Sequence, residues 1–207
     1  MPVWSPLPEW KGQSAIIVGG GHSLLGFDFS LLVGKNTIGC NHAYQLGPDK
    51  IKIVLFGDPS FWEKNRVELS TFPNRVVTCA PSILRAPIRW LYQMRRIRDG
   101  IHEGPILGWN YSTGAAAVNL AITLGAHRIF LLGFDMGARP DGRSHWHEAH
   151  PVAPRPQAYT RFIRGFHTLA ASAARYPHIK IFNVTDGSSL LPVFPRMDFP
   201  TFQKEVV

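Results

Sequence analysis

The chain has 207 residues, of which 45% are hydrophobic and 17% charged, a composition typical of one folded domain rather than a disordered or fibrous protein. No apolar run reaches the length of a membrane span, and the first residues lack the basic and apolar regions of a signal peptide. Two cysteines, Cys40 and Cys79, exclude a disulfide framework and a four-cysteine zinc site, so we expect a cytoplasmic protein.

The formal net charge of +8 is unevenly distributed along the chain. Residues 1–80 carry 7 Lys and Arg against 6 Asp and Glu, whereas residues 81–207 carry 15 against 8. Fifteen of the 22 basic residues are arginines, whose planar guanidinium binds phosphates and carboxylates through paired hydrogen bonds. The charge therefore predicts an anionic partner. Composition alone does not say whether that partner is a nucleic acid, a nucleotide or an acidic sugar.

Short β-rich runs alternate with turns and helical patterns along the chain. This alternation predicts a single Rossmann-like α/β domain over residues 1–207, with a mostly parallel sheet and helices on both faces. The expected strands are Ser14–Val18, Asn36–Gly39, Lys52–Phe56, Val76–Thr78, Arg128–Leu132 and Lys180–Asn183. The expected helices are Thr113–Leu124, which Gly125 ends, and Gln157–Tyr176, which Pro156 opens. Residues just after each strand are candidates for ligand binding, because ligands bind at the carboxyl ends of such strands.

A glycine-rich loop follows the first predicted strand. Gly19, Gly20 and Gly21 come directly after it, and Ser23 follows two residues later. Glycines let the backbone approach a ligand closely, so that N–H groups can cradle phosphate oxygens. The dinucleotide fingerprint is incomplete because Leu24 stands at its third position, and a Walker lysine is missing. The loop predicts nucleotide binding, with a plain tight connection as the alternative.

Two aspartates, Asp58 and Asp135, each follow a predicted strand. A carboxylate at that position can accept hydrogen bonds from ribose or acceptor hydroxyls, or hold Mg²⁺ through water. Asp58 could instead cap a helix that begins near Pro59. Asp135 is followed by no helical pattern, which favours a functional role for it.

The segment Ser82–Gly100 carries five arginines, and no acidic residue precedes Asp99. Three explanations compete: a solvated helix face, a site for an anionic acceptor or phosphate, and a nucleic-acid or membrane surface. Zinc-finger and RNP motifs are missing from the sequence, so we expect no sequence-specific nucleic-acid binding.

A second anion site is predicted where the Ala-rich helix begins. Ser112, Thr113 and Gly114 stand at its start, where unsatisfied N–H groups and the helix dipole favour a negative charge. Ser112 or Thr113 could equally be an ordinary N-cap.

The loop over residues 136–156 is rich in histidine, with His145, His147 and His150 close together around Glu148. One histidine could act as a general base, because its ordinary pKa lies near neutrality. Alternatively the histidines and Glu148 could hold a metal, or the loop could be purely structural. Trp146 could cover a bound sugar or anchor its own loop.

Four segments together resemble a known superfamily: GGGHSL after a strand, TIGCN ending at Asn41, YSTG opening an Ala-rich helix, and LLGFD ending at Asp135. The pattern resembles a bacterial and phage superfamily that contains lipooligosaccharide sialyltransferases and hydroxymethylpterin-pyrophosphokinase-like proteins. The resemblance covers roughly residues 14–190. His22 departs from it, because the family usually has proline there.

The resemblance implies a role for several residues. The resemblance implies that six residues contact the cytidine nucleotide of a donor: Gly19, Gly21, Ser23, Asn41, Thr113 and Gly114. It assigns the general base to a later histidine of the loop, which is His150 or His147, and it implies that a Ser-rich turn around Ser188 closes the nucleotide pocket. Turn formation alone would also explain Ser188.

We therefore expect a glycosyltransferase-like enzyme that uses a nucleotide-sugar, CMP-linked in the resembling enzymes, and an anionic small-molecule or glycan acceptor. No cofactor or metal is required for this chemistry if arginines and helix N-termini offset the charge of the leaving group. One alternative is an ATP-dependent pterin-type pyrophosphokinase, in which Asp58 and Asp135 would serve Mg²⁺. Another is a non-catalytic nucleotide- or nucleic-acid-binding phage accessory protein. Homo-oligomerisation is compatible with each of them.

Overall fold

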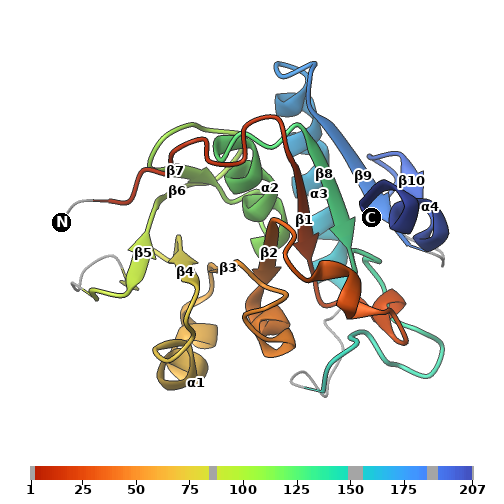
Figure 1. Cartoon of the computed structure of the whole chain (residues 1–207), viewed down its shortest axis with the longest axis horizontal. Coiled ribbons are helices and arrows are strands. Elements are labelled where there is room, and N and C mark those ends of the chain that lie inside the picture. The colour runs from red at the N-terminus through yellow and green to blue at the C-terminus, as the bar shows by residue number, and fades with distance from the viewer. Residues whose placement is uncertain (1–2, 84–87, 149–155, 186–190, 207) are drawn as a thin grey trace.

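An eight-stranded parallel sheet runs through the computed structural model, which describes residues 3–83, 88–148, 156–185 and 191–206 (Figure 1). Its strands are β1 Ser14–Val18, β2 Thr37–Cys40, β3 Ile53–Phe56, β4 Arg75–Thr78, β5 Leu91–Gln93, β8 Arg128–Leu132, β9 Lys180–Val184 and β10 Arg196–Met197. Their order across the sheet is β10-β9-β8-β1-β2-β3-β4-β5, so the winding reverses between β1 and β8. A small parallel pair, β6 Arg95–Ile97 and β7 Ile106–Gly108, lies beside the sheet.

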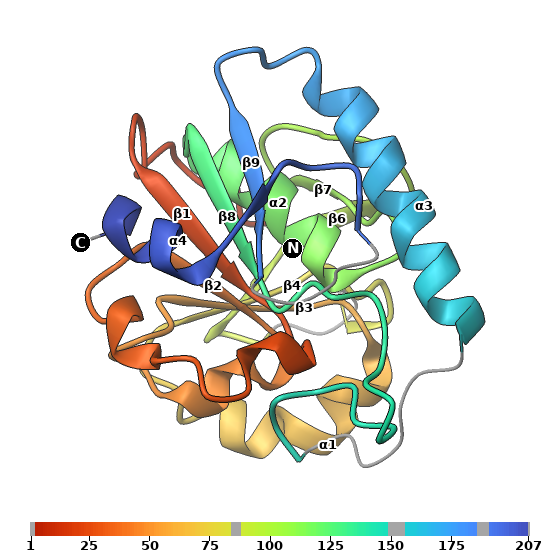
Figure 2. The ribbon, with the colours of Figure 1, turned by 90° about the vertical axis from the view of Figure 1, so that its right-hand side faces the viewer.

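Helices cover both faces of this sheet (Figures 1 and 2). The helices α2 Thr113–Thr123 and α3 Pro156–Ala173 pack on one face. The helices α1 Pro59–Leu69 and α4 Phe199–Val206 pack on the other face, together with 3₁₀ segments over residues 22–24, 29–32 and 41–46. The predicted α/β class, with a parallel sheet and helices on both faces, is confirmed.

The apolar strands supply the core on both sides of the sheet. In β1, Ala15 and Ile17 pack toward α2 and α3, whereas Ile16 and Val18 pack toward the opposite layer. This alternation is the two-residue repeat of a strand that is buried on both faces. The helix α2 is buried from Thr113 to Ile122, because it is covered by the sheet, by β7 and by α3. Its small alanines allow this close packing.

The expected elements are found within a few residues of their predicted bounds, except in the arginine-rich segment. There, the interpretation as a solvated helix face is wrong for the described residues, because they form the strands β5 and β6. The helix expected over Gln157–Tyr176 ends at Ala173. No helix in the described part of the chain is long and apolar enough to cross a membrane.

Candidate functional site

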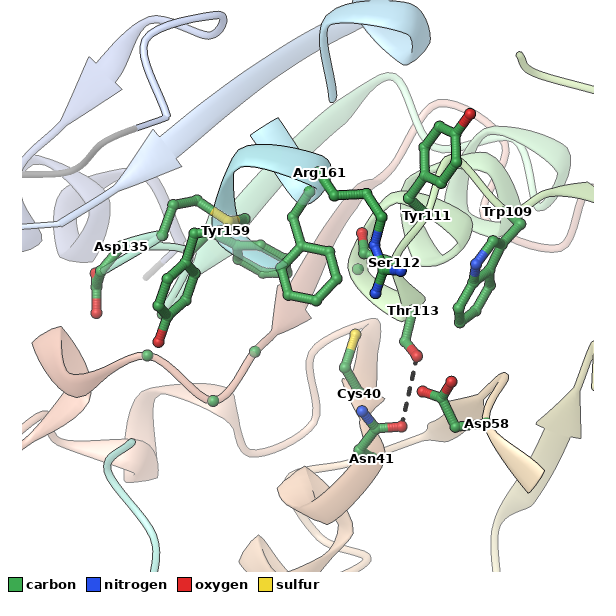
Figure 3. Close-up of a pocket in the computed structure, with 18 of the residues that line it drawn as sticks. Cys40, Asn41, Asp58, Trp109, Tyr111, Ser112, Thr113, Asp135, Tyr159 and Arg161 are labelled. Carbon is green, nitrogen blue, oxygen red and sulfur yellow. Dashed lines mark hydrogen bonds between the residues drawn. The ribbon is translucent and has the colours of Figure 1, made fainter. Parts of the chain in front are cut away.

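A pocket of about 770 Å³ opens at the carboxyl edge of the sheet, beside the reversal of strand order (Figure 3). Residues from the loops after β1, β2, β3 and β8, from the start of α2, from β6 and from α3 line it. The predicted site residues among them are Gly19, Gly20, Gly21, Asn41, Asp58, Ser112, Thr113, Gly114 and Asp135. Separate segments thus meet where a doubly wound sheet binds its ligands.

The glycine loop is bound to the end of β8 through every second N–H group. Gly19 N donates to Leu132 O at 2.8 Å, and Gly21 N donates to Gly133 O at 2.9 Å. Ser23 N donates to Asp135 Oδ2 at 2.8 Å. These three N–H groups are therefore used within the fold. Of the intervening N–H groups, that of Gly20 has no acceptor among the described residues.

Tight packing explains why glycine occupies these positions. A Cβ on Gly19 would lie 2.7 Å from Gly133 O, and one on Gly21 would lie 2.4 Å from Asp135 Oδ2. Real Cβ atoms do not approach oxygen atoms this closely. The contact with the end of β8 therefore requires glycine at both positions, whether or not a ligand is bound.

The start of α2 provides the second wall of the pocket. Ser112 is its N-cap, and its hydroxyl accepts from Ala115 N at 3.1 Å. The N–H groups of Thr113 and Gly114 belong to the first turn and have no acceptor within the helix. Thr113 Oγ1 lies 3.5 Å from Asn41 Oδ1, at the outer limit of a hydrogen bond (Figure 3). The positive end of the helix dipole and these free donors suit an anion.

Asp135 is buried beneath the glycine loop, with 2% of its surface exposed. Its Oδ2 accepts from Ser23 N and lies 3.7 Å from His22 Nδ1. Its Oδ1 and the hydroxyl of Ser23 have no hydrogen-bond partner among the described residues. Because buried polar atoms are nearly always satisfied, an unpartnered oxygen in a residue that lines a pocket points to a ligand that donates to that side chain. His22, which stands where the resembling superfamily usually has proline, lies beside this carboxylate.

Trp146 connects the histidine loop to the glycine loop through two hydrogen bonds. The Trp146 backbone N–H donates to Gly20 O at 3.0 Å, and its indole Nε1 donates to Gly19 O at 2.9 Å. Gly21 forms an isolated antiparallel bridge with His145, and the indole packs against Phe29 with ring centroids 5.1 Å apart. Of the two roles considered for Trp146, these contacts support the anchor of its own loop.

Of the loop histidines, His145 lines the pocket. Its Nδ1 lies 2.8 Å from Ser144 Oγ. His147 is not among the lining residues, and its ring centroid lies 5.2 Å from that of His145 and 5.3 Å from that of His42. His150 and Ser188 are outside the described residues, so their roles stay predictions. Within residues 3–83, 88–148, 156–185 and 191–206, no group of three or more His, Cys, Asp or Glu is arranged to hold a metal ion.

Asp58 stands at the N-cap position of α1, but its side chain makes no capping hydrogen bond there. The alternative of an ordinary helix cap is therefore wrong. The carboxylate lines the pocket instead (Figure 3). Burial of the group raises the pKa of Asp58, and the positive charges of Arg96 and Arg161 partly oppose that rise. A raised pKa means that the folded state disfavours the ionised carboxylate.

We expect Asp58→Asn to stabilise the protein at neutral pH. Because the folded pKa lies above the ordinary value of 3.8, the contribution of Asp58 to stability is fully present below 3.8 and is lost as the pH rises through the folded pKa. Thermal unfolding should therefore give a higher Tm for the variant near pH 7, and the gain should shrink toward pH 4. Asp28→Asn is the control, because hydrogen bonds from Ser30 lower the pKa of Asp28 and the sign should reverse.

Several lining residues were not predicted as site residues. They are Arg96, Arg98, Trp109, Tyr111, Tyr159 and Arg161. A two-residue strand repeat places Arg96 and Arg98 on one side, and a strand reading of residues 95–98 would have found this pair. Three lining residues other than glycine have positive φ: 52° at Asn41, 64° at Tyr111 and 56° at Met136. Such strained backbone is characteristic of functional sites.

No protein-family model matches the sequence, and no curated protein matches it. Among solved structures, this chain is similar to the sialyltransferase CstII from Campylobacter jejuni in complex with the substrate analogue CMP-3FNeuAc. The two sequences are 16% identical, the match covers 89% of this chain and 84% of that chain, and the TM-score is 0.50. The same enzyme in complex with cytidine-5′-monophosphate has 16% identity, coverage of 88% and 83%, and a TM-score of 0.48. The expected likeness to a sialyltransferase fold is confirmed. The likeness to pyrophosphokinases gains no support.

Proposed function

We propose that the chain is a glycosyltransferase-like enzyme that transfers a sugar from a nucleotide donor to a hydroxyl acceptor. One observation carries the proposal: the open N-terminus of α2 and Asp135, whose buried Oδ1 has no hydrogen-bond partner among the described residues, line one pocket at the reversal of the sheet. The first is suited to a phosphate and the second to a hydroxyl donor such as a ribose or a sugar. A nucleotide-sugar contains both groups.

The likeness in fold supports a CMP-linked donor in particular. The solved structure with a TM-score of 0.50 contains CMP-3FNeuAc, described as a substrate analogue of that sialyltransferase. In this chain the phosphate would bind at Thr113 and Gly114, with the N–H group of Gly20 as a further donor. Asn41 would contact the nucleotide from the end of β2.

In the proposed reaction, the acceptor oxygen bonds to the anomeric carbon as the bond from that carbon to the phosphate oxygen breaks. The negative charge left on the nucleotide is stabilised by the N-terminus of α2. The acceptor proton passes to a histidine of the 145–150 loop. The resemblance favours His147 or His150, whereas His145 is the described histidine that lines the pocket. We propose that no metal is required, because preorganised donors offset the charge.

Calorimetric titration with CMP, UDP and GDP tests the donor proposal. We expect CMP to bind without added metal and in the presence of EDTA. Thr113→Val should weaken this binding by about tenfold, since it removes one hydroxyl from the proposed phosphate site. Thr123→Val is the matched control, because Thr123 ends the same helix and its hydroxyl bonds Asn119 O and His102 O away from the pocket.

The proposal is wrong if none of the three nucleotides binds, or if both valine variants weaken binding equally. Binding of ATP that depends on Mg²⁺ would instead favour the pterin-type pyrophosphokinase. Steeply salt-dependent binding of oligonucleotides with no nucleotide binding would favour the accessory protein.

A further inference from the structure

The strand β6 and the residue after it place two arginines at the pocket. Arg96 and Arg98 line the pocket, whereas Arg95 and Ile97 are exposed on the other side of the strand. This arrangement follows from the alternation of side chains along a strand. Arg98 is already paired, since its Nε lies 2.8 Å from Asp99 Oδ2, and its side chain is 76% exposed. Arg96 is therefore the principal cation that β6 contributes.

Arg96 is held rigidly by its neighbours. Its guanidinium lies 3.8 Å from the centre of the Trp109 ring, and its Nη1 donates to Gly57 O at 3.1 Å. A Cβ on Gly57 would lie 2.0 Å from Trp109 Cζ3, so glycine is needed for the indole to lie where it does. Such a prepositioned guanidinium binds an anion without first losing side-chain entropy.

A second guanidinium, that of Arg161, reaches over the middle of the pocket from α3 (Figure 3). Arg161 is exposed and forms no ion pair with another described residue. Asp58 lines the same pocket, and the positive charges of Arg96 and Arg161 both act on its carboxylate. Two arginines and one carboxylate leave a net charge of one positive unit, which matches a singly charged anion better than a phosphate dianion.

The two ends of the pocket carry different chemistry (Figure 3). Asp135 and Tyr159 lie beside the glycine loop, whereas Asp58 and Trp109 lie at the opposite end, with Arg161 reaching over the middle. The proposed nucleotide site uses the first end and the start of α2. The opposite end, with Asp58, Trp109 and Arg96, is called the arginine end below, and it remains available for the second substrate.

We infer that the arginine end binds an acceptor with a carboxylate group, held by Arg96 and Arg161, while Asp58 accepts a hydrogen bond from a hydroxyl of the same molecule. The acceptor class is thus a hydroxy acid, of which a sugar acid is the simplest carbohydrate example. A carboxylate matches the planar guanidinium fork, and a neighbouring hydroxyl gives Asp58 a donor. This inference rests on the proposed glycosyltransferase-like function, because it assigns the acceptor for that reaction.

A matched pair of probes tests the inference by NMR titration of the full chain, with and without CMP. Galacturonate and galactose differ in the carboxylate, and galactose 6-phosphate supplies a dianion instead. We expect galacturonate to bind about tenfold more tightly than galactose and more tightly than the phosphate. Arg161→Gln should remove this preference. Arg164→Gln is the control, because Arg164 is an exposed arginine of the same helix that does not line the pocket.

Equal binding of galacturonate and galactose would overturn the inference, as would a preference that survives Arg161→Gln. Tighter binding of galactose 6-phosphate would also overturn it, in favour of a phosphate site. The proposed function fails separately: if no nucleotide binds but galacturonate still binds through Arg161, the anion site stands and the donor assignment is lost. If CMP binds and galacturonate shows no preference, the donor assignment stands and the anion site is lost.

Discussion

Gly21→Ala is expected to reduce nucleotide affinity by about 100-fold or more, equivalent to at least about 2.7 kcal/mol of binding free energy. The added Cβ would lie 2.4 Å from Asp135 Oδ2 and 2.5 Å from Gly133 O. Gly133 O is a backbone atom that cannot rotate away, so the loop must move from the end of β8. That movement breaks the Gly21 N to Gly133 O hydrogen bond and displaces Asp135 Oδ2, which accepts from Ser23 N.

The same substitution should lower the free energy of unfolding by about 1–3 kcal/mol, as overpacking of a close contact usually does. Calorimetry measures the affinity for CMP, and denaturant unfolding measures the stability. Gly34→Ala is the control: Gly34 has a φ of +75° and open space around a Cβ, so alanine there costs about 1 kcal/mol of strain without touching the pocket. If Gly34→Ala and Gly21→Ala impair CMP binding alike, the glycine loop has no specific role.

The core of the fold could be predicted because its signals are local. The strand β1 is a run of small and branched apolar residues that ends in three glycines, and α2 is an alanine run between Ser112 and Gly125. Both patterns are complete within a dozen residues. The parallel sheet then brings the residues after β1, β2, β3 and β8 to one edge. Site residues that were predicted on separate segments therefore line the same pocket.

The rest of the site depends on contacts between distant parts of the chain. Arg96 lines the pocket because three-residue strands pair as β6 and β7; an alternating strand pattern separates Arg96 from Arg95 but does not say which of the two faces the pocket. Arg161 is 65 positions further along the chain, on an amphipathic helix whose other arginine, Arg164, is exposed. The hydrogen bonds of the glycine loop likewise depend on the register between β1 and β8, so a sequence pattern could not tell which N–H groups are used.

Gly114→Ala tests whether close packing against Phe134 fixes the position of the start of α2. A Cβ on Gly114 would lie 2.2 Å from Cε1 of Phe134, a ring that is 6% exposed and packs edge-on against Phe166 at 5.7 Å. Helix propensity favours alanine over glycine by about 1 kcal/mol, whereas a clash of this size in a packed core costs about 1–3 kcal/mol. The clash should prevail, so the variant should lose stability although alanine is the better helix former.

Phe134→Leu makes room for the added methyl group, so the two substitutions should not be additive. Thermal unfolding of both single variants and the double variant should show a coupling of about 1–2 kcal/mol, with the double variant more stable than the sum of the single effects. CMP affinity should follow the same pattern, because the phosphate site is the first turn of α2 and shifts with it. Additive effects on stability would mean that the helix accommodates the methyl group without Phe134. Recovery of stability without recovery of CMP affinity would mean that the N-terminus of α2 is not the phosphate site.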